Sequence, residues 1–206
     1  MPKERRNTLF NLIAPVYGLF YNKQKNRYRE VIAGFTQDWQ QSDYQSILDI
    51  GCGTGALCSA LNEAGLTVTG VDPAQHMLSI ARRQTQDQDI QFLAANAVEG
   101  LPFADKSFDL SIASYVAHGL QKSERIKLYS EMRRVTKGKV ILYDYNQNRS
   151  PLISFVEWLE HGDYFGFIQN PKGEMEDCVT ELEKCFSDAI CVDVDKRAAW
   201  YICTPR

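Results

Sequence analysis

Residues 46–55 read SILDIGCGTG, and this stretch decides the fold. Its first half contains a short apolar run at 47–50 that predicts a buried strand. Its second half has glycine at every other position, which permits a tight turn and lets the backbone approach a ligand. A helix is expected over 54–64, and Gly65 is suited to end it. A glycine turn after the first strand of an open α/β sheet marks a ligand-binding crevice.

Short β-rich segments and longer segments of helical period alternate along the rest of the chain, which is the pattern of a largely parallel sheet. Further strands are expected at 67–72, 90–94, 108–113 and 139–144, and helices at 73–85, 123–135 and 174–186. Ser123 is expected to be the N-cap of the second of these helices. Strands at 189–194 and 198–203 should close the sheet as an antiparallel hairpin, and a short helix is expected near 152–160.

We expect these elements to form a single domain, because 206 residues are enough for one core and no repeat or low-complexity linker interrupts them. Its expected parts are an N-terminal helical cap at 1–45, a cofactor-binding core at 46–145, a lid-like insertion at 146–174, and a closing helix and hairpin at 175–206.

Charge and composition argue against several classes of function. Lys and Arg number 23 against 26 Asp and Glu, so the net charge of -3 gives no basic field for nucleic acid. The six cysteines have no CxxC spacing, and no metal site is expected, even from Cys185 and Cys191. The N-terminal segment has the layout of a signal peptide, but Asn11, Pro15 and Gly18 interrupt its apolar run. We expect a cytoplasmic protein without an integral membrane segment.

The second expected strand ends in an acidic residue, Asp72, which lies 21 residues after Gly51. A carboxylate at that place can accept hydrogen bonds from the hydroxyls of a ribose. The glycine spacing is G-x-G-x-G, whereas turns that hold the pyrophosphate of a dinucleotide have the spacing G-x-G-x-x-G. The pattern therefore favours a ligand that is a nucleoside without phosphate. It argues against NAD as the ligand, and so against an NAD-dependent oxidoreductase.

Four motifs, in order, resemble those of the class I S-adenosylmethionine-dependent methyltransferases of type 11. They are LDIGCGTG at 48–55, VDP at 71–73 followed by Met77 and Leu78, NAVEGLPF at 96–103, and SFDL at 107–110. The segment FNLIAPVY at 10–17 is similar to the quinone-biosynthesis methyltransferases. The resemblance implies S-adenosyl-L-methionine as cofactor. It also implies a Rossmann-like, mostly parallel sheet of seven strands, ordered 3-2-1-4-5-7-6, with helices on both faces.

The resemblance also implies how the cofactor is held. The backbone near Gly51 and Gly53 would receive the methionine part, with Asp49 near its ammonium. Asp72 would hold the ribose. Asn96 would accept a hydrogen bond from the adenine amino group, where the family usually has Asp, and the N–H of Ala97 would donate to the ring. The full set of expected cofactor-binding residues is Asp49, Gly51, Cys52, Gly53, Gly55, Asp72, Pro73, Met77, Asn96, Ala97, Tyr17 and Tyr21. The family's Lys-Pro-Gly-Gly before the fifth strand is here TKGK at 136–139, which should shorten a surface turn.

A methyl group on a cationic sulfonium is already activated, so the protein mainly has to align a small-molecule acceptor for in-line displacement. A general base would add about 10²- to 10⁴-fold. His118 is the candidate for that base, because it follows the fourth expected strand by a few residues. Tyr115, Tyr143, Asp144 and Tyr145 border the same rim, although side chains that alternate along a strand cannot all face one ligand.

The aromatic residues outside the motifs have two interpretations. Tyr17 and Tyr21, four apart on an expected helix, either close over the cofactor or pack in the core. Those of the insertion favour a small, partly apolar acceptor pocket; they are Phe155, Trp158, Tyr164, Phe165 and Phe167. The motifs do not specify the acceptor, the choice among O-, N- and C-methylation, or the oligomeric state. A catalytically silent subunit that only binds the cofactor is the alternative function.

Overall fold

The computed structural model describes residues 18–35, 44–148, 163–180 and 185–206. The expectations for Tyr17 and the motif at 10–17, for a helix near 152–160, and for Phe155 and Trp158 lie outside these residues. The chain divides into two compact units, Met1–Asn96 and Ala97–Arg206, called unit 1 and unit 2 below.

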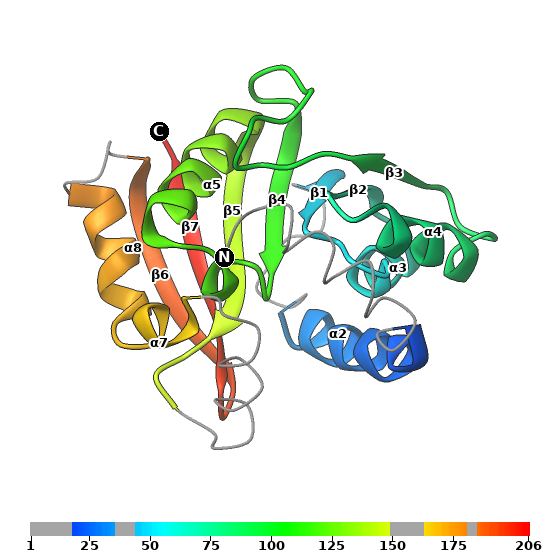
Figure 1. The fold of residues 1–206 in the computed structure, drawn as a ribbon, viewed down its shortest axis with the longest axis horizontal. Coiled ribbons are helices and arrows are strands. Elements are labelled where there is room, and N and C mark those ends of the chain that lie inside the picture. The colour runs from blue at the N-terminus through cyan, green and yellow to red at the C-terminus, as the bar shows by residue number, and fades with distance from the viewer. Residues whose placement is uncertain (1–17, 36–43, 149–162, 181–184) are drawn as a thin grey trace. The chain divides into compact units, whose positions relative to one another are not determined.

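Unit 1 alternates helices and parallel strands (Figure 1). Its elements are α2 (Tyr21–Phe35), β1 (Ser46–Ile50), α3 (Ala56–Glu63), β2 (Thr67–Asp72), α4 (Gln75–Gln84) and β3 (Ile90–Ala94). β2 lies between β1 and β3, so that Val71 pairs with Ile50 on one side and Leu93 on the other. The apolar side chains of β1 and β2 are buried, as expected for strands covered on both faces.

The N-terminal helix α2 packs against α3. Arg29 donates to the carboxylate of Glu63 at 2.8 and 2.9 Å, and Lys25 lies 2.6 Å from the same carboxylate. These ion pairs are largely exposed and contribute little, whereas Tyr21 and Val31 are buried. The packing of these two side chains therefore does more to attach the helix.

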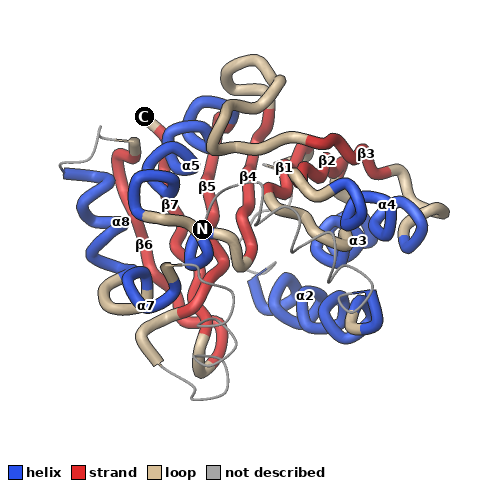
Figure 2. The backbone as a smooth tube through the Cα atoms, viewed as in Figure 1, coloured by secondary structure: helices blue, strands red, loops and turns tan. Residues whose placement is uncertain are grey.

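Unit 2 contains the remaining strands and the helices between them (Figure 2). Its elements are β4 (Phe108–Ser114), the 3-10 helix η1 (Ala117–Gly119), α5 (Lys122–Val135), β5 (Thr136–Tyr145), α7 (Tyr164–Phe167), α8 (Pro171–Thr180), β6 (Phe186–Asp195) and β7 (Ala198–Pro205). β4 and β5 are parallel, and β7 is antiparallel to both β5 and β6. The expected closing hairpin is therefore confirmed, with both strands longer than expected.

The strand order of the seven-stranded sheet is β3-β2-β1-β4-β5-β7-β6. This order confirms the one that the resemblance implied. β1, β2 and β3 fall within a residue of their expected bounds, and β4 is one residue longer. The helix expected from 73 begins at Gln75, because Pro73 and Ala74 form the turn that precedes it.

The expected N-cap of α5 was wrong. The helix begins at Lys122, and its N-cap is Gln121 instead of Ser123. The backbone N–H of Gln121 donates to the Glu124 carboxylate at 3.0 Å, and the two residues form a reciprocal capping box. A glutamine cap is rarer than a serine cap, so the sequence favoured the wrong residue.

The helix expected at 174–186 was also misplaced. α8 begins at Pro171, which suits a first helical position, and Asn170 accepts a hydrogen bond from the N–H of Gly173 at 3.1 Å. Phe186 does not belong to a helix, because it begins β6 and pairs with Pro205. The expectation followed apolar periodicity and overlooked this capping signal.

No turn separates α5 from β5, although one was expected at residues 136–139. β5 begins at Thr136, directly after the helix, and its pairing with β4 shifts register between Phe108 and Leu110. The irregular pairing takes up the extra residue of the longer strand. The hydroxyl of Thr136 donates to that of Ser111 at 2.8 Å, so this start of the strand is buried and hydrogen-bonded.

Candidate active site

The glycine turn after β1 has the backbone conformation that its sequence predicts. Gly51, Gly53 and Gly55 have φ angles of 71°, 52° and 80°, in the left-handed region that favours glycine. A Cβ at Gly53 would have no atom within 4 Å, whereas one at Gly55 would meet the Cβ of Ala81 at 3.0 Å. Gly55 therefore allows close packing on α4, and Gly53 leaves an open face on the turn.

Asp72 connects this turn to the start of α4. One of its oxygens accepts a hydrogen bond from the N–H of Gly53 at 2.9 Å, and the other accepts one from the N–H of Ala74 at 2.7 Å. Burial raises the pKa of Asp72, and these two hydrogen bonds act to lower it. Each carboxylate oxygen can accept more than one hydrogen bond, so this structural role leaves acceptor capacity for a ligand.

Asp49 is a buried carboxylate with one oxygen unsatisfied. Its side chain is 1% exposed, and Oδ2 accepts a hydrogen bond from the thiol of Cys58 at 3.1 Å. Oδ1 has no hydrogen-bond partner among the described residues. Burial raises the pKa of Asp49 to about 7; the Cys58 hydrogen bond acts against this rise, and the charge of Asp72 adds to it. A buried oxygen in this condition is suited to receive a donor from a ligand.

Two thiols pack beneath the turn. The Sγ atoms of Cys52 and Cys58 each lie 2.9 Å from the point where a Cβ of Gly70 would stand, so the missing side chain makes room for both. Burial raises the pKa of Cys52 to about 11 and that of Cys58 well above its ordinary value. The thiols therefore stay protonated, and Cys58 acts as a hydrogen-bond donor to Asp49 rather than as a nucleophile.

The other expected cofactor-binding residues fall into several environments. Met77 and Ala97 are buried, Asn96 is half-buried directly beyond β3, and Pro73 is exposed at the end of β2. Tyr21 is 3% exposed, which agrees with the core interpretation, although its hydroxyl has no hydrogen-bond partner among the described residues.

The described residues of unit 1 fit the cofactor that the resemblance implied. S-adenosylmethionine has an ammonium group and two ribose hydroxyls as donors. Unit 1 offers the unsatisfied Oδ1 of Asp49, the remaining acceptor capacity of Asp72, and the open face at Gly53. Its chemistry therefore suits a positively charged nucleoside without phosphate.

Unit 2 contains a buried histidine–carboxylate pair. Nδ1 of His118, in η1, lies 2.7 Å from Oδ1 of Asp144 near the end of β5. The backbone N–H of His118 donates to Oδ2 of Asp144 at 3.2 Å, and the N–H of Tyr145 donates to Oδ1 at 2.8 Å. Because a carboxylate accepts, the neutral imidazole carries its proton on Nδ1 and its lone pair on Nε2. This arrangement is that of an oriented base.

Tyrosines surround the imidazole. The ring centroids of Tyr145 and Tyr164 lie 4.8 and 6.3 Å from that of His118, and Tyr115 lies at 6.3 Å. Tyr115 has a φ of 54°, and its N–H donates to the carbonyl of Tyr143 at 2.8 Å. A positive φ at a tyrosine is strained, and such strain is common beside functional groups.

Comparison with known proteins identifies the family of the chain. A family model for a methyltransferase domain matches residues 47–139. A demethylmenaquinone methyltransferase from Paenarthrobacter aurescens is 33% identical over 152 residues, which cover 70% of this chain and 56% of the relative. The chain belongs to the class I S-adenosylmethionine-dependent methyltransferases. S-adenosylmethionine is thus its cofactor.

A second relative supports the assignment, and two solved structures of other proteins have the same fold. An uncharacterised methyltransferase from Staphylococcus carnosus is 27% identical over 195 residues, covering 85% of this chain and 90% of that one. A protein from Methanococcus maripaludis assigned to the same enzymes superposes with a TM-score of 0.68 at 20% identity, covering 95% of this chain and 93% of that one. A protein from Pyrococcus horikoshii superposes with a TM-score of 0.64 at 22% identity, covering 86% of this chain and 89% of that one. These structures show the shared fold.

The described residues lack two features that would indicate other functions. None of their helices combines the length and the apolar character needed to cross a bilayer. Nor do His, Cys, Asp and Glu side chains in this part of the chain gather in threes or more at a place suited to a metal ion.

Arg125 on α5 connects the segments around the histidine of this methyltransferase. Its side chain is 2% exposed, and its Nε and one terminal nitrogen each donate to an oxygen of Glu174 at 2.7 Å. The other terminal nitrogen, NH1, donates to the carbonyl of Leu120 at 2.7 Å and to Asp163 at 2.9 Å. Tyr129 donates to Glu174 at 2.8 Å. Removing one partner of such a buried pair typically costs about 3 to 5 kcal/mol.

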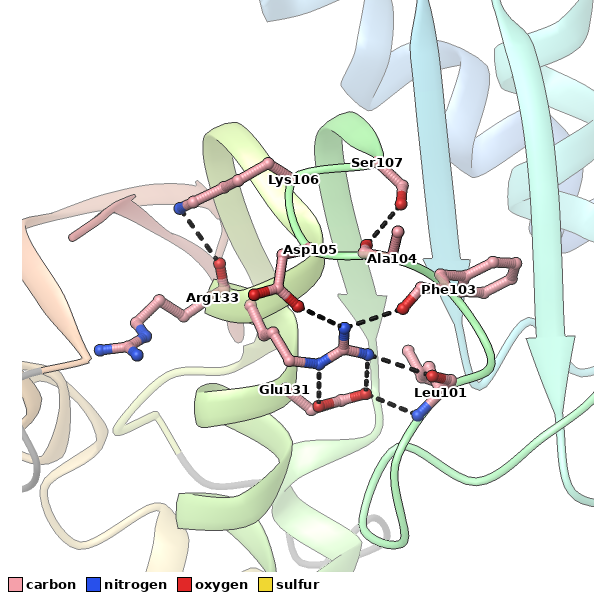
Figure 3. Close-up of polar contacts among 9 residues, drawn as sticks. Leu101, Phe103, Ala104, Asp105, Lys106, Ser107, Glu131 and Arg133 are labelled. Atoms are coloured by element: carbon pink, nitrogen blue, oxygen red, sulfur yellow. Dashed lines mark hydrogen bonds and ion pairs between the residues drawn. The ribbon is translucent and has the colours of Figure 1, made fainter.

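A second arginine on the same helix makes a similar set of contacts at another place. Glu131 and Asp105 converge with the carbonyls of Leu101 and Phe103 on the guanidinium of Arg134 (Figure 3). The Arg134 side chain is 31% exposed, and the Asp105 side chain is 75% exposed. This cluster fastens the loop before β4 to the end of α5 and contains none of the expected site residues.

Sequence reasoning missed three residues of these sites. Arg125 lies in the helix expected at 123–135 and was not considered as a site residue. Glu174 was treated only as the start of a helix, and Cys58 was not considered as a partner of Asp49. A basic residue one turn before buried Tyr129 was the only available signal for the first of them.

Proposed function

We propose that this protein transfers a methyl group from S-adenosylmethionine to a small-molecule acceptor by in-line displacement, with His118 as the general base. The observation that carries the proposal is the buried pair of His118 and Asp144, whose nitrogen and oxygen lie 2.7 Å apart. The bound cofactor supplies a methyl group activated by its sulfonium charge. The protein must bind it, align the acceptor, and take a proton.

All but one of the residues that hold the cofactor in this proposal belong to unit 1, and the exception is Ala97. Asp49 receives the ammonium on its unsatisfied oxygen, the backbone near Gly51 and Gly53 receives the methionine part, and Asp72 accepts hydrogen bonds from the ribose. Asn96 accepts one from the adenine amino group, and the backbone N–H of Ala97 donates to the ring. The partnerless Oδ1 of Asp49 and the open face at Gly53 support these roles.

Asp144 fixes the state of His118 in which it can accept a proton. Three donors surround its carboxylate: Nδ1 of His118, the N–H of His118, and the N–H of Tyr145. They hold the imidazole in one orientation with Nε2 as the basic nitrogen. An acceptor hydroxyl, or an acidic C–H, would give its proton to Nε2 as its nucleophilic atom attacks the methyl carbon.

Each set of residues lies at strand ends of the kind that bind ligands. In an open α/β sheet, ligands bind beyond the carboxyl ends of the strands. Gly51 and Asp72 lie at the ends of β1 and β2, and His118 and Asp144 lie at the ends of β4 and β5.

The test uses methyl-labelled S-adenosylmethionine and a small-molecule extract of cells, with the parent, His118→Ala and Asp144→Asn. The parent should transfer label, and His118→Ala should transfer it about 10²-fold more slowly or worse, because a positioned base contributes that much. Asp144→Asn should also lose transfer, because an amide disfavours the required tautomer. All three should bind S-adenosylhomocysteine equally.

Three outcomes contradict parts of this proposal. If His118→Ala transfers label at the parental rate, His118 is not the general base. Failure of the parent to bind S-adenosylhomocysteine in calorimetry would remove the cofactor assignment. A parent that binds it and transfers no label would instead favour the catalytically silent alternative.

A further inference from the structure

We propose that Arg125 is a positioning residue for the acceptor side of the active site, acting through Asp163 to hold Tyr164 against His118. The inference rests on the proposed role of His118 as base. It assigns a task to a buried charge that neither the motifs nor the family resemblance accounts for.

A single nitrogen of Arg125 joins two segments that contain site residues. NH1 donates to the carbonyl of Leu120, two residues after His118, and to Oδ2 of Asp163, the residue before Tyr164. The rings of His118 and Tyr164 lie 6.3 Å apart at an angle of 88°. The spacing of these two segments, and therefore of the two rings, depends on this nitrogen.

The rest of the guanidinium fixes the position of that nitrogen. Glu174 receives two parallel hydrogen bonds from it and a third from Tyr129, at 2.7, 2.7 and 2.8 Å. Phe167 packs its ring 5.5 Å from the charged carbon. Bidentate pairing of this kind restrains the direction of an arginine as well as its charge.

The two carboxylates on Arg125 differ in exposure, and this difference separates their roles. The Glu174 side chain is 10% exposed and satisfies the buried charge, whereas the Asp163 side chain is 29% exposed. Loss of Glu174 would leave the charge of Arg125 buried without its main partner and would lower the stability of the fold. Loss of the Asp163 carboxylate should instead release the start of α7 and leave the main ion pair intact.

Gly166 gives a second way to move Asp163 without changing any charge. A Cβ at Gly166 would collide with the carboxylate oxygens of Asp163, which are the end of a flexible side chain. Gly166→Ala should therefore push that carboxylate away from Arg125. Asp163→Asn and Gly166→Ala change the same contact by unrelated means, so a shared effect would point to the contact itself.

Asp105→Asn is the matched control. NH1 of Arg134 donates to Asp105 and to a backbone carbonyl, while Nε and NH2 of Arg134 donate to a glutamate, Glu131. The control therefore removes the same kind of bond from the same helix and leaves the surroundings of His118 unchanged.

The experiment measures the nuclear Overhauser effect between the His118 and Tyr164 rings, label transfer to the small-molecule extract, and S-adenosylhomocysteine affinity. Only three histidines are present, and His118→Ala identifies the signal. We expect Asp163→Asn and Gly166→Ala to lose the ring contact and at least tenfold in transfer, with cofactor affinity unchanged. Asp105→Asn should keep the parental ring contact, label transfer and cofactor affinity.

Retention of the ring contact in both variants would overturn the proposal, as would parental transfer in variants that have lost it. Neither result bears on whether His118 is the base, because the transfer rate of His118→Ala is measured separately. If His118→Ala transfers at the parental rate, the proposed base is wrong, whatever the ring contact shows.

Discussion

The two units build their sites with carboxylates in opposite states. In unit 1, Asp49 is buried with one oxygen unsatisfied, and burial raises its pKa to about 7. In unit 2, Asp144 is fully buried and accepts hydrogen bonds from three donors. A carboxylate that lacks a partner is suited to bind, and one with every partner in place is suited to position. The comparison agrees with the proposal that Asp49 binds the cofactor and that Asp144 orients His118.

The largest expected effect is on the unfolding free energy, which the buried and unsatisfied carboxylate of Asp49 lowers. Its pKa rises from 3.8 to about 7 on folding, so the folded chain holds a proton that the unfolded chain releases. The stability that this proton contributes is fully present below about pH 4 and is lost as the pH rises toward 7. Asp49→Asn should therefore gain in unfolding free energy over the parent across that window, by at most about 4 kcal/mol at 1.36 kcal/mol per unit.

Urea titrations of both proteins at several pH values measure this gain, and calorimetry measures the affinity for S-adenosylhomocysteine. The amide should bind the ligand's ammonium more weakly, so stability and affinity should change in opposite directions. A difference in stability that does not vary with pH, or a gain in affinity, would contradict the binding role of Asp49.

A smaller effect is expected where the glycine turn packs on β2. A Cβ at Gly70 would lie 2.9 Å from Cys52 Sγ, Cys58 Sγ and Phe92 Cδ1. Movement of one of these three groups alone would not relieve the overlap. Gly70→Ala should cost about 1 to 3 kcal/mol of unfolding free energy through overpacking. Gly119→Ala in unit 2 is the control, since its Cβ would have no atom within 4 Å. Equal melting temperatures for the two variants would refute this packing argument.

The same contrast explains what could be predicted from sequence. The glycine turn and the two carboxylates of unit 1 lie between Asp49 and Asp72, and glycine spacing together with strand ends locates them. In unit 2, His118 and Asp144 are 26 residues apart, and Arg125 and Glu174 are 49 apart. His118 could be named from its place after a strand. Its pairing with Asp144, and the burial of Arg125, depend on how α5, β5 and α8 pack. Local sequence patterns do not predict that packing.

The central claim is that the carboxylates Asp49 and Asp72 determine cofactor affinity, whereas the pair of His118 and Asp144 does not. The most direct test is calorimetric titration of S-adenosylhomocysteine into the parent, Asp72→Ala and Asp144→Asn, with each variant shown to be folded by urea titration. Asp72→Ala should bind at least about tenfold more weakly, since a lost charged hydrogen bond is worth at least about 1.4 kcal/mol. Asp144→Asn should bind like the parent. Equal weakening of both variants, or parental affinity in Asp72→Ala, would contradict the account.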